Sequence, residues 1–266
     1  MSFSGDVKEE LSKVVNFNQE VLNAELGGYF LSGNMLENTD NFEFITENEF
    51  NIEHLYKILF YLEMEYEPEV RGKCYVAQLQ KRDVLETIRK VKVVKIDMRK
   101  NIVKGAFLGA GSVNNPEKNY HLEMIFNQKK NSDFILQICD EYGINFKEIK
   151  VNDRFQLYLK EGEEISRFLA LIGANRSVLK FEEVRVMKEM KNHVNRKVNC
   201  ETANLNKTID AAIRQIDDIR LIQKRKKFDE LPKELKDVAN LRLENPDLSL
   251  KDLSELIKPP IRKVWN

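Results

Sequence analysis

The spacing of hydrophobic and polar residues predicts a mixture of helices and strands in the first two thirds of the chain. Asn18, followed by an apolar face over residues 21–30, is typical of a capped helix. Apolar runs at 42–45 and 75–79 predict two strands, and the helical spacing at 52–62 places a helix between them. This first set of elements ends before Lys95.

The same order of elements then returns. The second set contains, in chain order, a helix at 102–110, a strand at 120–126, a helix at 132–142, strands at 145–151 and 155–159, and a helix at 165–172. The pattern therefore predicts an α+β fold with two αββαββ halves.

The last third of the chain reads as helical. No glycine follows Gly173, and no proline lies between Pro116 and Pro232. One apolar stripe occupies positions spaced by four and three residues, and we expect it to dock on the second half: Leu205, Ile209, Ala212, Ile216 and Ile219. A short helix up to residue 244 and a second one capped by Ser249 and Asp252 then indicate the start of a helix-turn-helix.

Two glycine-containing nonamers carry the repeat. Residues 25–33 and 103–111 both have glycine at the third and ninth places, 78 residues apart. Small residues at this spacing let two helix backbones approach closely. We therefore expect the two halves to meet at a helix pair related by a pseudo-two-fold axis. The glycines of the second nonamer do not indicate a dinucleotide loop, because no strand precedes them.

Each nonamer resembles the LAGLIDADG helix of homing endonucleases. The second nonamer, continued through Ser112-Val113-Asn114-Asn115-Pro116-Glu117, is similar to the bacterial WhiA family, as is the run NHVNRKVNCETANLNKT at 192–208. The resemblance covers nearly the whole chain. It implies a degenerate endonuclease-like domain followed by a helix-turn-helix, and a DNA-binding regulator of cell division, chromosome segregation and, in spore formers, sporulation.

The resemblance also identifies what is missing. In the endonucleases the eighth place of the nonamer is an acidic residue that holds a divalent metal, and such cations prefer carboxylate oxygen. Here those places are Ser32 and Ala110. Glu25, at the start of the first nonamer, is expected to cap or orient its helix. We therefore expect a non-catalytic protein with no metal and no cofactor, and regard an active metal-dependent endonuclease as the alternative.

Charge is distributed unevenly, although 43 basic and 43 acidic side chains cancel. Residues 1–70 hold 15 acidic and 3 basic side chains, whereas 180–227 hold 13 basic and 7 acidic ones. Basic residues concentrate at 81–104 and in the run Lys224–Lys227. Such asymmetry indicates a nucleic-acid or membrane-surface partner, but a solvated helix surface explains either stretch alone equally well. A protein-interaction scaffold that uses the acidic N-terminal half is a further alternative.

Five asparagines at 192–206 lie among basic residues, and amide bracing between domains explains them better than DNA contact. The candidate DNA-binding residues, with double-stranded DNA as the partner, are Arg196, Lys197, Lys207, Lys224, Arg225, Lys226, Lys227, Ser249, Leu250, Lys251, Lys258, Arg262 and Lys263.

The sequence offers too few residues for a recognition helix, because Pro259-Pro260-Ile261 are followed only by Arg262-Lys263-Val264-Trp265-Asn266. We therefore expect this module to be truncated and DNA binding to be weak and unspecific.

The expected domains are the first half at 1–95, the second half at 96–178, a helical connector at 179–227 and the partial helix-turn-helix at 228–266.

With 42% hydrophobic residues, 32% charged residues and no apolar run approaching 18 residues, the chain reads as a globular protein without a membrane span. Three widely separated cysteines fit a reducing cytoplasm, where we expect the protein to associate with the nucleoid. Other regulatory or division proteins are possible partners.

Overall fold

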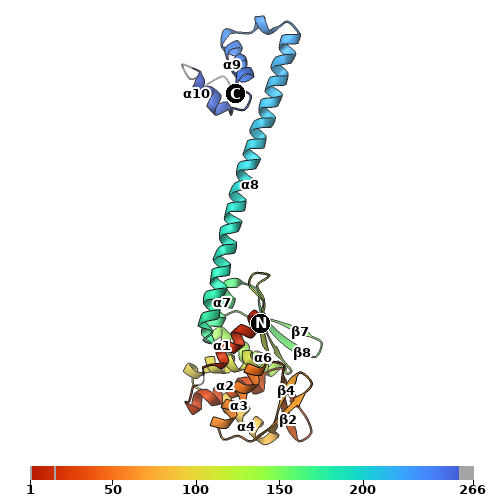
Figure 1. Ribbon diagram of the computed structural model, residues 1–266, viewed down its shortest axis with the longest axis vertical. Coiled ribbons are helices and arrows are strands. Elements are labelled where there is room, and N and C mark those ends of the chain that lie inside the picture. The colour runs from red at the N-terminus through yellow and green to blue at the C-terminus, as the bar shows by residue number, and fades with distance from the viewer. Residues whose placement is uncertain (1, 15, 258–266) are drawn as a thin grey trace. The chain divides into compact units, whose positions relative to one another are not determined.

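The repeat is present as two four-stranded antiparallel sheets, each with its own helices (Figure 1). This computed structural model describes residues 2–14 and 16–257, in two units that divide between Met187 and Lys188. The first copy consists of α2 (Gln19–Leu31), β1 (Met35–Glu37), β2 (Asn41–Thr46), α3 (Glu49–Tyr61), β3 (Tyr66–Arg71), β4 (Cys74–Gln80) and α4 (Lys81–Val91). The second copy consists of α5 (Arg99–Ala110), β5 (Gly111–Val113), β6 (Leu122–Phe126), α6 (Lys129–Glu141), β7 (Lys147–Val151), β8 (Arg154–Leu159) and α7 (Gly162–Leu171).

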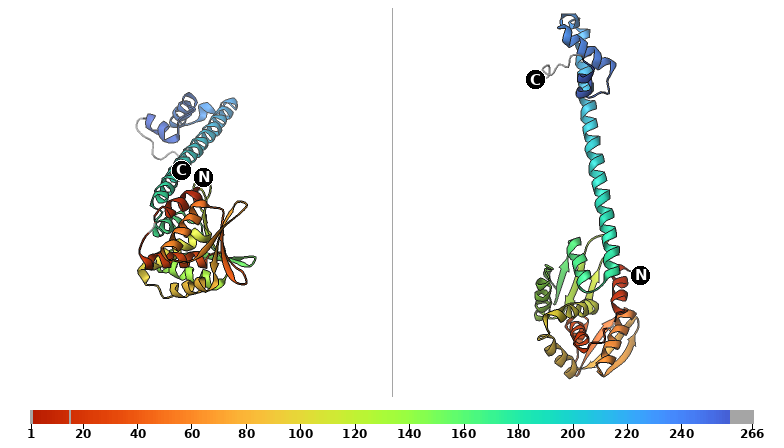
Figure 2. Two further views of the ribbon diagram at one scale, coloured as in Figure 1. Left: turned by 60° about the horizontal axis from the view of Figure 1, so that its bottom comes forward. Right: turned by 90° about the vertical axis from the view of Figure 1, so that its left-hand side faces the viewer.

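The two sheets have the same strand order, β1-β2-β4-β3 and β5-β6-β8-β7. Pairing of Phe44 with Ala77, and of Met124 with Leu157, puts buried apolar side chains on one face of each sheet. The helices pack against that face and the strands lie along the other side of the unit (Figures 1 and 2).

The predicted α+β architecture of two pseudo-symmetric halves is confirmed, as are the five helices and five strands expected within it. The strands that the pattern missed are short or polar. β3, for example, contains Pro68 between the acidic residues Glu67 and Glu69. It forms an edge of its sheet. The helix α4 was missed because only Val84, Thr87 and Val91 are buried on it, among many charged residues.

An N-terminal helix, α1 (Phe3–Ser12), and a short 3₁₀ turn, η1 (Ile96–Met98), complete the connections. Phe3 packs on Phe181 of α8 (Asn175–Lys224), with ring centroids 6.2 Å apart. The Glu10 carboxylate accepts hydrogen bonds from the backbone N–H groups of Arg176 and Ser177, at 2.7 and 2.9 Å. A carboxylate at these free N–H groups stabilises the start of α8.

The two halves meet where α2 and α5 lie in backbone contact. A Cβ atom at Gly28 would lie 2.0 Å from the carbonyl oxygen of Ile102, and one at Gly105 would lie 1.9 Å from that of Glu25. Only hydrogen fits at these two positions, which explains the third-place glycine of the second nonamer. Around this contact the apolar residues of both halves form one continuous core.

The second unit contains the end of α8, the 3₁₀ turn η2 (Phe228–Glu230), α9 (Lys233–Glu244) and α10 (Leu250–Leu256). Ser249 accepts from the N–H of Asp252, and Asp252 accepts from the N–H of Ser249, which is the predicted capping box. Arg242 is buried and ties the elements together by donating to Gln215 Oε1 at 3.0 Å and to the carbonyl of Leu248 at 2.6 Å.

The apolar stripe on α8 divides into an exposed part and a part that packs within the second unit. Leu205 and Ile209 are exposed, whereas Ala212 is buried and Ile219 lines an apolar hollow together with Leu235 and Val238 of α9. The C-terminal part of the stripe thus packs on α9 within the second unit. Docking of the stripe on the second half-domain stays a prediction. Within the described ranges, no helix combines the length and apolar character that a membrane span requires.

We expect Gly105→Ala to destabilise the protein by about 3 kcal/mol, because the methyl group must push the backbones of α2 and α5 apart. Gly162→Ala is the matched control, since a Cβ there meets only the movable side chains of Arg185 and Tyr120 at 3.3 Å. Urea denaturation measures both. Equal losses of stability in the two variants would contradict the close-contact account.

Candidate functional site

The ends of the paired helices bring together the two positions at which an endonuclease would hold its metal. Ser32 ends α2, and its backbone N–H donates to the carbonyl of Tyr29 at 3.1 Å. Ala110 is the last residue of α5. A Cβ atom at the neighbouring Gly109 would lie 2.4 Å from Ser32 Oγ, so the helix ends are in contact.

The groups at these ends do not fit a divalent metal. The Ser32 hydroxyl donates to the Tyr29 carbonyl at 2.7 Å, and Ala110 offers only a methyl group. The carbonyls at the end of α5 are already engaged, because Asn51 Nδ2 donates to Leu108 and Asn34 Nδ2 to Gly109. In the part of the chain that the structure describes, no three His, Cys, Asp or Glu side chains are placed to hold a metal ion. The hard oxygen ligands that Mg²⁺ prefers are missing from this place.

A buried charge network lies further up the same helix pair. Glu25 on α2, only 2% exposed, receives a 2.7 Å hydrogen bond from His54 Nε2 on α3 and a 3.0 Å ion pair from Lys104 Nζ on α5. His54 Nδ1 also lies 3.0 Å from the carbonyl of Ser12. One carboxylate therefore joins three helices drawn from both halves.

Burial works to raise the pKa of Glu25, but the hydrogen bond from His54 and the charge of Lys104 outweigh it and leave this pKa below its usual value. The prediction that Glu25 caps its helix is wrong, since α2 begins six residues earlier at Gln19. Spacing along the sequence also gave no indication that His54 lies beside Glu25. The available signal was the presence of charged Glu25 and Lys104 inside two otherwise apolar nonamers.

The basic stretch at 81–104 is mostly neutralised within the protein. Six of its nine basic side chains form ion pairs, including Lys81 with Glu37 at 2.6 Å and Lys90 with Glu86 at 2.7 Å. Exposed pairs of this kind contribute little stability, but they do reduce the positive charge available to a phosphate backbone. The structure thus favours the solvated-surface interpretation for this stretch.

The run Lys224–Lys227 is different. All four side chains are exposed, and none forms an ion pair with a residue in the ranges 2–14 and 16–257. Arg196, Lys197 and Lys207 on α8 are likewise exposed and unpaired within those ranges. The five asparagines among them are exposed too. Amide bracing between domains stays a prediction.

Lys226 sits in a conformation that favours glycine. Its φ is 56°, and it follows the end of α8, where its N–H donates to Gln223 and the N–H of Lys227 donates to Ile222. This is the helix-ending motif in which glycine is the usual residue. A lysine here costs stability, so the basic run is kept at an energetic disadvantage.

Three further candidates belong to the capped turn before α10. The Ser249 hydroxyl donates to Asp252 Oδ2 at 2.7 Å, while Leu250 and Lys251 are exposed in the first turn of the helix. Lys258, Arg262, Lys263 and the recognition-helix prediction lie outside the described residues. No contact with DNA is defined for any of these positions, so their role stays a prediction.

The fold and these surfaces define a class: a LAGLIDADG-like domain without the metal-binding carboxylates, joined to a C-terminal helix-turn-helix region. The model of the WhiA LAGLIDADG-like domain matches residues 99–191, and that of the WhiA C-terminal HTH domain matches 194–264. The chain belongs to the WhiA family.

Similarity to individual proteins extends over the whole chain. It is 36% identical to a "Probable cell division protein WhiA" of Clostridium tetani over 296 residues, covering 99% of this chain and 93% of that protein. A namesake from Clostridium botulinum is 37% identical, with the same coverage of 99% and 93%. The crystal structure of full-length DUF199/WhiA from Thermatoga maritima superposes with a TM-score of 0.66 at 26% identity, covering 96% of this chain and 91% of that one.

We expect Lys104→Met to cost about 3 kcal/mol or more at neutral pH, because it leaves the Glu25 carboxylate buried without its ion-pair partner. The lowered pKa of Glu25 means that its stabilising effect is present above pH 4.5, the usual value, and is lost as the pH falls further. Lys104→Met should flatten this acid-side loss, because the Glu25 pKa rises without the lysine.

Denaturant titrations between pH 3 and pH 7 (roughly the window set by Glu25) measure this effect. The double variant Glu25→Gln/Lys104→Met is the control, and we expect it to lose less stability than the two single variants combined. Strict additivity would show that the two side chains do not interact.

Proposed function

We propose that this protein is a non-catalytic, DNA-binding regulator of bacterial cell division that holds duplex DNA through its C-terminal unit. The observation that carries the proposal is the exposed, unpaired run Lys224–Lys227, which lies within the region matched by the WhiA helix-turn-helix model. The names of the clostridial relatives support the assignment to cell division.

The main contribution to DNA binding in this proposal is electrostatic. Unpaired lysine and arginine side chains neutralise phosphates and release counterions, which makes affinity fall steeply with salt. Arg196, Lys197 and Lys207 extend this basic surface along α8. At the start of α10, the exposed Lys251 adds a further cation for a phosphate. Base readout falls to the helix-turn-helix, in which we also place Lys258, Arg262 and Lys263.

We assign the N-terminal domain a positioning role and no catalytic activity. Ser32 and Ala110 supply no carboxylate where a hydrolytic relative of this fold needs one, which disfavours the alternative of an active endonuclease. We extend the proposal to chromosome segregation, to sporulation in spore formers, to association with the nucleoid and to other division proteins as partners. We also propose that the four expected domains, 1–95, 96–178, 179–227 and 228–266, are the functional parts of this regulator.

We expect Lys224→Ala/Arg225→Ala/Lys227→Ala to weaken duplex binding and to lower the salt slope of log affinity by about 2–3, close to 0.9 for each lost phosphate contact. Fluorescence anisotropy with a labelled duplex, at several salt concentrations, measures both quantities. Arg89→Ala/Lys92→Ala/Lys100→Ala is the matched control, because it removes from the other unit three exposed bases that form no ion pair with a described residue.

Lys226→Gly separates binding from stability. Glycine relieves the left-handed backbone, so this variant should be more stable by about 1 kcal/mol and yet bind DNA less tightly. Equal weakening by the two triple variants would place the contact elsewhere and refute the proposal.

A further inference from the structure

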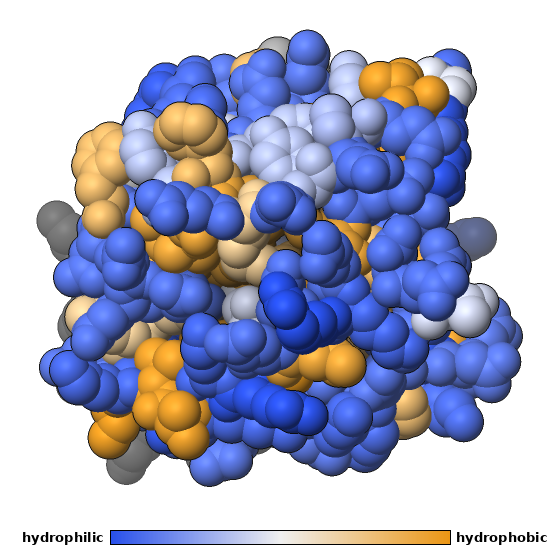
Figure 3. All heavy atoms as spheres, turned by 90° about the horizontal axis from the view of Figure 1, so that it is seen from below, coloured by the Kyte–Doolittle hydropathy of each residue, from blue (hydrophilic) through white to orange (hydrophobic). Residues whose placement is uncertain are grey.

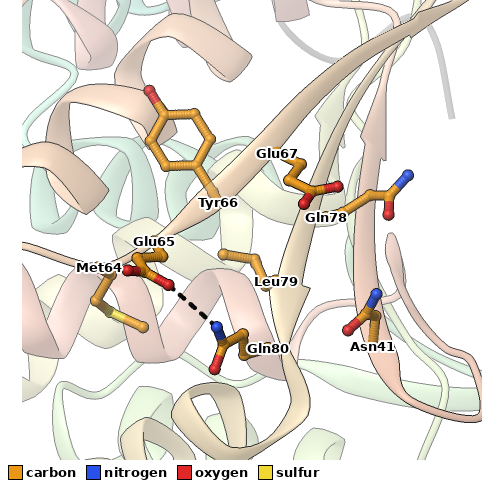
Figure 4. Close-up of a pocket in the computed structure, with 8 residues that line it drawn as sticks. All are labelled: Asn41, Met64, Glu65, Tyr66, Glu67, Gln78, Leu79 and Gln80. Carbon is orange, nitrogen blue, oxygen red and sulfur yellow. Dashed lines mark hydrogen bonds between the residues drawn. The ribbon is translucent and has the colours of Figure 1, made fainter.

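Two hollows in the first half-domain share one lining residue and are therefore neighbours. The first, of about 320 Å³, lies between the start of α2, the end of α3 and α4. The second, of about 460 Å³, lies over β3, β4 and the start of β2 (Figure 4). Met64 lines both of them. We call these two neighbouring hollows together the acidic groove.

Carboxylates follow the groove from end to end. They are Glu63, Glu65, Glu67, Asp83 and Glu86, against the single base Lys90. Lys90 pairs with Glu86 at 2.7 Å, and Glu65 accepts a 3.1 Å hydrogen bond from Gln80 (Figure 4). Glu63 and Glu67 are exposed and have no ion-pair partner among the described residues. The groove therefore offers unneutralised negative charge at two separate points.

Glu63 is held in the groove against the preference of its backbone. Its φ is 54°, and it ends α3 with its N–H donating to Phe60 and that of Met64 donating to Leu59. The equivalent place at the end of α6 is Gly143, with φ 70° and the same two hydrogen bonds. One half of the repeat thus uses the favoured glycine and the other a strained glutamate.

An exposed aromatic cluster borders one end of the groove. Tyr61, which lines the first hollow, contacts Phe17 and Phe60 edge-on, with centroids 5.0 and 5.6 Å apart. Phe17 is 68% exposed and Phe60 73% exposed. On the face in Figure 3, hydrophobic side chains form small patches among hydrophilic ones. Exposed aromatics beside a charged groove are typical of a docking surface.

We infer that the acidic groove docks a lysine- and arginine-rich segment of a partner protein, with an apolar residue of that segment placed on Tyr61. We choose this occupant because its positive charge complements the negative charge of the groove. DNA is repelled by the carboxylates, and within the ranges 2–14 and 16–257 no three acidic, His or Cys side chains converge as a metal requires. This surface acts independently of the proposed DNA contact, and its test contains no DNA.

The probe is a fluorescein-labelled octapeptide of alternating lysine and arginine with one terminal leucine, titrated with the full chain at about 50 mM salt. We expect Glu63→Gly/Glu67→Gln to weaken binding about tenfold. Glu63→Gly alone should also weaken it, while raising the melting temperature by a few degrees because glycine suits the backbone. Tyr61→Ala should weaken binding of this peptide but not of one that lacks leucine.

Glu47→Gln/Glu53→Gln is the matched control, since it removes two exposed carboxylates of the same half-domain outside the groove. We expect it to change affinity less than twofold. Equal weakening by the control and groove variants would show only diffuse attraction and overturn the inference. So would binding of a glutamate-rich peptide with similar affinity. Self-association in sedimentation, abolished by Glu63→Gly/Glu67→Gln, would assign the groove to a second copy instead.

Discussion

The backbone contact between α2 and α5 is the constraint on which the rest of the structure depends. Gly28 and Gly105 leave no space for a side chain between the helices, so the two halves are locked in one register. The same contact fixes the positions of the helix ends, and of the buried Glu25 beside Lys104. Close packing at the centre of the α2–α5 pair thus determines which residues come together at its two ends.

Buried charge adds specificity to that packing. Burying Glu25 is costly, and the cost is offset only when His54 and Lys104 are both in position. These partners come from different helices, so a shifted register would leave the carboxylate unpaired. The arrangement holds the two helix ends together, where the nonamers place a hydroxyl at Ser32 and a methyl group at Ala110.

Charge at the surface is divided between two tasks. The bases at 81–104 are largely used in ion pairs, whereas those at Lys224–Lys227 are exposed and form no ion pair with a described residue. At two helix ends, Glu63 and Lys226 occupy left-handed positions that would be more stable with glycine. Both lie in surfaces that we assign to binding, one acidic and one basic. Residues kept at a cost in stability are informative about function.

Periodicity and the repeated nonamers were sufficient to predict the α+β fold, the pairing of the halves and the positions of Ser32 and Ala110, because these follow from local spacing. The short strand β1 and the polar strand β3 left too weak a pattern, since few of their residues are buried. The Glu25–His54–Lys104 network could not be derived either, because its members are far apart in the sequence. The strain at Glu63 and Lys226 requires backbone angles, which composition does not provide.

The most direct measurement is cleavage of supercoiled plasmid by the purified chain with Mg²⁺ or Mn²⁺, set against the same reaction in EDTA and a Ser32→Ala variant. Without a carboxylate at the helix ends, the account predicts no nicking above the EDTA control. Metal-dependent nicking that Ser32→Ala abolishes would contradict it, because the helix ends would then form a working metal site.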